Sequence, residues 1–389
     1  MRDLITKKYW FSALLFVLLG ILMVLGDGES SFVDIVGVAA VIVIIVLATF
    51  FRKALRPFPR EFIAAWVSLL LYLFAVTPFS MDVGFSIRTS VRYLDAFLVY
   101  WAFYVFTDRG EEKFFIRALS IFGGIALIPA LLFSFVPALR LNLPLMSLFW
   151  SYTGHNHITD VLLFMLLPVL VLVEKLSPFR YWVFALLIMF FAFFQARSAL
   201  VLAIIASLCF VLTMYKKRIS IRALKVIILV SILSITIIIA VPVIQNMYFS
   251  QTQQGKSSLT TRIEFYQQAL LAIRARPIFG WGPGTYLLLS PRFQSTSDQS
   301  TWFAHNYVLE TAAETGLVGL GLFMWVLFAC CIRPVIRICR AKTTDTTCVA
   351  VAGSISLLLL YGLADYPLNY LVIWILFWAA CGLLSKYEE

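Results

Sequence analysis

Charged residues are scarce in this sequence. They make up only 13% of its 389 residues, whereas an ordinary soluble domain carries about 25%. Hydrophobic residues account for 62% and aromatic residues for 16%, and the mean hydropathy is +0.93. These proportions exclude an ordinary soluble domain. They predict an all-α integral membrane protein.

The sequence also lacks internal repeats, low-complexity tracts and a second soluble domain. The N-terminal stretch has no A-x-A-like cleavage site, so we interpret it as the first membrane helix and not as a signal peptide. About twelve apolar segments, most close to the roughly 20 residues that cross a bilayer, are predicted as spans. They are 10–26, 32–51, 62–79, 93–107, 114–136, 158–173, 180–196, 198–215, 222–243, 307–332, 347–364 and 367–385.

Basic residues are rare in every second loop of this twelve-span arrangement. Most of the 31 Lys and Arg fall in the alternate loops and the tail that are cytoplasmic if both termini are cytoplasmic. The net charge of +11 therefore indicates topology, and nucleic-acid binding is not expected. None of the six cysteines falls in a predicted outward loop, so we expect no structural disulfide.

Only one soluble segment is long. It divides the chain into predicted helices 1–9 (residues 1–243), an extracytoplasmic loop (244–304) and helices 10–12 (305–389). Thr261 and Glu264 have capping-box spacing, which predicts an amphipathic helix that ends near Pro277 and lies at the membrane surface. Its predicted apolar stripe is Ile263, Tyr266, Leu270 and Ile273. The glycine-rich turn that follows is no dinucleotide fingerprint, because Pro283 interrupts it and no strand precedes it.

Histidine is the scarcest titratable residue, with three copies. His155 and His157 are two residues apart and form no metal-binding pair, and their role is left open. His305 stands at the start of a span, where it can act as an acid or base near neutral pH or simply form an interfacial hydrogen bond. Asn306, Glu310 and Glu314 share one helix face, to orient a substrate or to pair with an arginine.

Arginines near the outer surface are the candidate anion-binding groups. Arg197 interrupts an apolar stretch, so it either reaches toward lipid headgroups or grips phosphate oxygens. Arg262 lies in the first turn of the predicted loop helix, a position suited to an anion site. Arg274 and Arg276 complement the dipole at the helix end. Asp365, between the last two spans, is a turn residue or the partner of an outward arginine.

Five motifs surround the long loop in a characteristic order: QARSA (195–199), TRIE (261–264), PIFGWGPGTY (277–286), HNYVLE (305–310) and ETGLVG (314–319). Together they resemble the O-antigen ligase and polymerase superfamily over about residues 190–370. The resemblance implies a GT-C-type glycosyltransferase of about twelve transmembrane helices, with one large periplasmic loop between helices 9 and 10. It would lie in the bacterial inner membrane, with its active site facing the periplasm.

The resemblance further implies transfer of a glycan from undecaprenyl diphosphate with inversion, and with no metal and no cofactor. His305 would activate the acceptor hydroxyl, while Arg197 and Arg262 would bind the diphosphate. The remaining candidate substrate-binding residues are Asn306, Glu310, Glu314, Asp365 and Arg276.

The acceptor distinguishes the alternatives within this superfamily. We rank an O-antigen ligase, which uses lipid A-core, above a polymerase, which uses a second lipid-linked glycan. A protein O-oligosaccharyltransferase ranks third, because no large extra C-terminal domain is seen. A transporter of lipid-linked glycans would instead require ionisable residues near mid-membrane in repeated halves.

Overall fold

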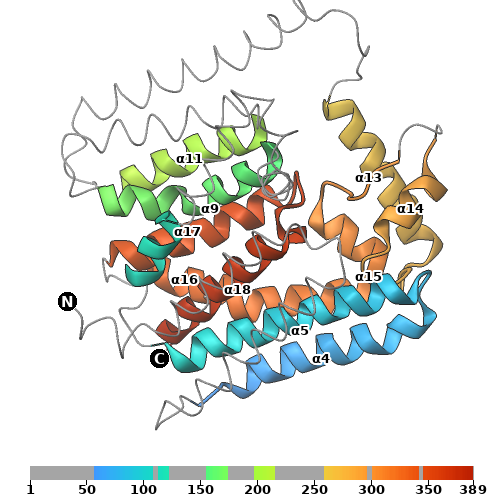
Figure 1. Cartoon of the computed structure of the whole chain (residues 1–389), viewed down its shortest axis with the longest axis horizontal. Helices are drawn as coiled ribbons and strands as arrows, with labels where there is room; N and C mark the ends of the chain where they lie inside the picture. Colours follow the sequence, from blue (N-terminus) through green and yellow to red (C-terminus); the bar gives the residue numbers. More distant parts are fainter. Residues whose placement is uncertain are drawn as a thin grey trace, which may run out of the picture. The chain divides into compact units, whose positions relative to one another are not determined.

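The computed structural model describes residues 57–107, 113–121, 155–173, 197–214, 258–295, 300–340 and 345–388. Every regular element within these ranges is helical, which confirms the all-α expectation for this part of the chain (Figure 1). The chain divides into two compact units. The first comprises Met1–Arg109, Lys256–Arg340 and Gly362–Glu389, and the second comprises Gly110–Gly255 and Ala341–Tyr361.

The first unit is a bundle of mostly apolar helices with α13 and α14 at one end (Figure 1). Its α-helices are α4 (Arg60–Val76), α5 (Val83–Phe106), α13 (Ser258–Ala275), α14 (Tyr286–Phe293), α15 (Tyr307–Leu327), α16 (Arg333–Arg340) and α18 (Leu371–Ser385). Helix α5 packs against α18, and α15 packs against α4. Large aromatic side chains fill the bundle; for example, Trp66 and Trp378 lie 4.6 Å apart between ring centroids.

The second unit contains α9 (His155–Val173), α11 (Arg197–Met214) and α17 (Thr346–Tyr361), which pack against one another. Helix α17 approaches α9 at Gly353, where a side chain would meet Leu167. The missing side chain at this point leaves room for Leu167 between the two helices.

Among the described residues, two helices are long and apolar enough to cross a membrane, Arg60–Phe79 and Tyr307–Arg340. Shorter apolar helices occupy Thr159–Leu172, Thr346–Tyr361 and Leu371–Ser385. These five fall on predicted spans. The predicted spans at 10–26, 32–51, 180–196 and 222–243 lie outside the described residues.

Several predicted boundaries were wrong. Helix α5 begins at Val83 and not near residue 93, because the Asp82 side chain caps it by accepting from the Phe85 N–H at 3.0 Å. His155 and His157 lie in the first turn of α9 and not in the loop before it. The start of α11 at Arg197, by contrast, agrees with the predicted span at 198–215 to within one residue. The basic segment after residue 332, predicted as a loop, is helix α16.

The predicted loop helix exists as α13, but its details differ from the expectation. It begins at Ser258, ahead of the expected cap at Thr261. The buried face carries Phe265, Gln268, Ala269 and Ala272, whereas Ile263 and Leu270 of the predicted stripe are exposed. The reason is that α13 packs on α14 and α15, and its alanine face permits the closest approach.

Helix α15 is broken at Gly316, whose φ of 68° interrupts the helical backbone. The break turns main-chain groups toward the glycine-rich turn. The Trp281 and Gly282 N–H groups donate to the Glu314 carbonyl at 2.9 and 2.7 Å, and the Leu317 N–H donates to the Pro277 carbonyl at 2.8 Å. The two glycine-containing motifs, PIFGWGPGTY and ETGLVG, are therefore hydrogen-bonded to each other through their main chains.

Gly316→Ala is expected to destabilise the protein by several kcal/mol. A side chain there would meet the backbone of Ile278 and Phe279, and the positive φ alone costs a non-glycine residue about 1–2 kcal/mol. The matched control is Gly321→Ala in the same helix, where a Cβ meets nothing within 4 Å. Thermal unfolding in detergent compares the two variants. Equal unfolding temperatures would contradict the close approach at Gly316.

Candidate active site

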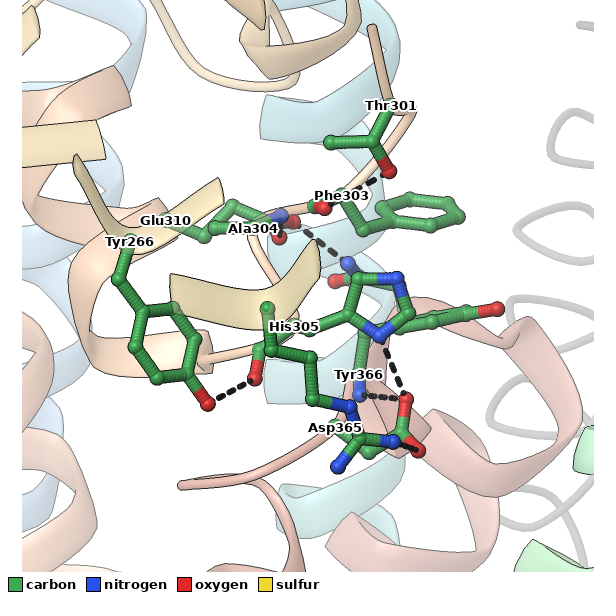
Figure 2. Close-up of polar contacts among 10 residues, drawn as sticks. Tyr266, Thr301, Phe303, Ala304, His305, Glu310, Asp365 and Tyr366 are labelled. Atoms are coloured by element: carbon green, nitrogen blue, oxygen red, sulfur yellow. Dashed lines mark hydrogen bonds and ion pairs between the residues drawn. The ribbon is translucent and has the colours of Figure 1, made fainter. Parts of the chain in front are cut away.

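Asp365 stands at the centre of a three-residue cluster at one end of the first unit. Its Oδ2 accepts from Arg262 Nη2 at 3.1 Å, and its Oδ1 lies 3.2 Å from His305 Nδ1 (Figure 2). The Tyr366 N–H also donates to Oδ1 at 3.1 Å, so the carboxylate is held by its own turn. The side chain of Asp365 is 6% exposed, against 23% for Arg262 and 19% for His305. The carboxylate is thus buried, while the arginine and the histidine that contact it are partly accessible.

The contact with Asp365 determines which ring nitrogen of His305 carries the proton. An ionised carboxylate paired with a guanidinium only accepts hydrogen bonds. Nδ1 therefore carries the proton, and Nε2 retains the lone pair with which a general base accepts a proton. The same logic orients the histidine of other carboxylate–histidine pairs.

The backbone of His305 is itself unusual. Among the described residues, it is the one non-glycine residue with positive φ, at 53°. Its ring stacks on Phe265 at 5.5 Å and meets Tyr366 edge-to-face at 4.6 Å. The Tyr266 hydroxyl donates to its carbonyl at 3.2 Å (Figure 2). These contacts hold a backbone conformation that non-glycine residues rarely adopt. Such conformations are often found at functional positions.

The hydroxyl of Tyr266, in α13, lies close to the Asp365 cluster. Burial raises the pKa of its hydroxyl, and Asp365 acts in the same direction, while Arg262 opposes the shift. The hydroxyl therefore remains protonated and keeps donating to the His305 carbonyl.

Glu310 and Asn306 fix the segment that carries His305. Glu310 is buried and accepts from the Ala304 N–H at 2.8 Å and from Asn369 Nδ2 at 2.5 Å. Asn306 caps α15 by accepting from the Val308 and Leu309 N–H groups at 3.1 and 3.0 Å. Both side chains thus stabilise the turn that presents His305, and neither pairs with an arginine in these bonds.

Glu314 performs the same task for the glycine-rich turn. Its carboxylate accepts from the Gly284 and Tyr286 N–H groups at 2.8 and 2.9 Å. Together with its main-chain carbonyl, this one residue binds four N–H groups of the segment 281–286. The geometry makes Glu314 an anchor of the turn; direct substrate contact by Glu314 stays a prediction, as it does for Glu310 and Asn306.

The other candidates lie elsewhere. Arg276 stands over the Trp281 ring at 4.1 Å and makes none of the contacts of the Asp365 cluster. Arg197 begins α11 in the second unit, and its side chain lies outside the described residues. Tyr266, Tyr366 and Asn369 were not predicted as site residues, although Tyr366 and Asn369 follow Asp365 closely in the sequence.

The fold and the site define a helical protein with long apolar helices and a carboxylate that contacts both a histidine and an arginine. Residues 182–324 match the family model described as O-antigen ligase, so this segment carries the domain of a membrane-embedded family of glycan-transferring enzymes. The match confirms the resemblance found in the sequence and implies lipid-linked glycans as substrates in general. It includes Arg197, Arg262, His305 and Glu314, while Asp365 lies beyond it. No curated protein matches the chain.

Proposed function

We propose that the protein is a periplasmic-face glycosyltransferase of the bacterial inner membrane, with twelve transmembrane helices in a GT-C-type arrangement. It moves a glycan from undecaprenyl diphosphate to an acceptor hydroxyl, and lipid A-core is the proposed acceptor, as in an O-antigen ligase. The observation that carries the proposal is Asp365 bridging Arg262 and His305, in a chain that contains the O-antigen ligase domain.

In the proposed reaction, Nε2 of His305 takes the proton of the acceptor hydroxyl. The oxygen attacks the anomeric carbon, the bond from that carbon to the diphosphate oxygen breaks, and the configuration inverts. Negative charge develops on the departing diphosphate, and fixed cations aimed at it lower the barrier by several kcal/mol. Arg262 supplies such a cation: one of its five N–H donors binds Asp365, and the others are available for phosphate oxygens. Arg197 is the second proposed diphosphate ligand.

The acceptor is tested with purified full-length protein and a polyprenyl-diphosphate-linked oligosaccharide, with and without lipid A-core and with EDTA present. We expect product only with lipid A-core, and no loss of rate from chelation. A ladder of lengthened glycans without lipid A-core would show an O-antigen polymerase instead. A requirement for added Mg²⁺ would contradict the metal-free mechanism.

Arg262→Lys is expected to lower glycan transfer about 10- to 100-fold, the range of one or two charge-assisted hydrogen bonds. Lysine keeps the charge, but it cannot bind Asp365 and a phosphate at the same time through a planar fork. Rates are compared at saturating acceptor. The control is Arg333→Lys, which is expected to leave transfer unchanged. Arg333 pairs with the exposed Glu61 at 2.7 Å. Full activity of Arg262→Lys would remove Arg262 from the site.

A further inference from the structure

A second group of cations lies outside the proposed catalytic cluster, around Trp281. The guanidinium carbon of Arg276 is 4.1 Å from the centroid of this ring, and that of Arg292 is 5.1 Å from it. Both arginines are exposed, and neither forms an ion pair with a carboxylate among the described residues. Two like charges are thus held at one ring without a neutralising partner in this part of the chain.

Trp281 is a fixed platform for these cations. Its ring is almost buried, its Nε1–H donates to the Ala272 carbonyl at 3.0 Å, and Phe293 packs edge-on at 5.8 Å. A guanidinium that stacks on an indole uses its face, which leaves the N–H donors on its edge available. Donors arranged in this way suit the oxygens of a phosphate group.

Exposed apolar side chains follow Arg276 in the chain. Ile278 and Phe279, which lie between Arg276 and Trp281 in the sequence, are 57% and 61% exposed. The backbone of this segment bonds to α15 where Leu317 and Val318 are 57% and 42% exposed. Helix α15 belongs to an apolar stretch long enough to span the membrane. The exposed apolar side chains at 278–279 and 317–318 therefore lie on two segments that are hydrogen-bonded to each other, and Arg276 immediately precedes the first of them.

We propose that Arg276 and Arg292 bind the phosphate of an anionic glycerophospholipid, whose acyl chains lie on Ile278, Phe279, Leu317 and Val318. Charge and position both favour this ligand. Unpaired arginines beside a hydrophobic surface at a membrane boundary attract anionic headgroups, and the apolar surface favours acyl chains over a soluble anion. The inference assigns Arg276 to a membrane lipid and not to the glycan, and it does not depend on the proposed reaction.

Native mass spectrometry of the full-length protein in detergent tests this site, with dioleoylphosphatidylglycerol titrated against dioleoylphosphatidylcholine. We expect the wild type to retain the anionic lipid preferentially. The double variant R276Q/R292Q is expected to weaken its binding about tenfold or more and to leave phosphatidylcholine binding unchanged. Arg274→Gln, which removes an exposed charge from the same helix end, is the matched control and is expected to change binding by less than twofold.

Three results would overturn the proposal. The double variant would bind phosphatidylglycerol as the wild type does, or Arg274→Gln would weaken binding as much as the double variant, which would show unspecific attraction. Alternatively, undecaprenyl phosphate would displace phosphatidylglycerol at equal concentration, which would assign the site to the glycan carrier. If R276Q/R292Q does not fold, R276K/R292K keeps both charges without the stacked plane. We then expect a loss of about threefold or more, and unchanged binding would refute the geometry.

Discussion

Replacing His305 with asparagine is expected to lower glycan transfer by about 10²- to 10⁴-fold, the usual contribution of a general base. Asparagine is chosen because it tolerates positive φ, so the backbone at this position keeps its conformation. The side chain loses the basic nitrogen and its stacking on Phe265. The loss should appear in kcat, measured with saturating donor and acceptor.

Tyr266→Phe is the control for this variant. It removes the hydrogen bond to the His305 carbonyl but leaves the imidazole and its contact with Asp365 in place. We expect it to retain most of the activity. Substantial transfer by His305→Asn, in protein with an unchanged unfolding temperature, would exclude His305 as the base.

Asp365→Asn is expected to reduce transfer by at least about 10²-fold, because an asparagine amide can donate to Nδ1 and so favour the unproductive tautomer of His305. It also removes the charge that holds Arg262. Asp345→Asn is the control, because Asp345 also accepts a backbone N–H, at the start of α17, and makes no contact with the cluster.

A double-mutant cycle separates the two roles of Asp365. If Asp365 acts partly by positioning Arg262, the losses caused by Asp365→Asn and Arg262→Ala will not add. Simple additivity would show that Asp365 acts through His305 alone. An Asp365→Asn variant with wild-type kcat would contradict both roles.

The sequence predicted the residues of the cluster better than it predicted their contacts. His305 and Arg262 were identified from their types and positions, and Asp365 was proposed as a possible partner of an outward arginine. That partner proved to be Arg262, which is 103 residues away in the chain. Nothing in the local sequence specifies such a pairing, because it depends on α13 and the turn before α18 meeting in space.

The glutamates show the same limit more sharply. The spacing of Glu310 and Glu314 correctly suggested one helix face, but it gave no indication that both would accept backbone N–H groups. Likewise, the hydrophobic stripe predicted for α13 is partly exposed, since the face that is buried depends on its neighbours. The start of α5 also depended on one capping residue, Asp82, in a stretch of polar and apolar residues that was not predicted as helical.

By itself, the sequence determined the helical membrane class, the apolar helices and the order of the motifs of a glycan-transferring family. Hydropathy and backbone hydrogen-bonding needs in lipid are local properties, so composition along the chain is sufficient for them. Only the tertiary structure decided that Asp365 joins His305 to Arg262, that Glu314 and Gly316 hold the glycine-rich turn, and that Arg276 and Arg292 share Trp281. Each of these depends on side chains brought together by packing between helices, which no short segment encodes.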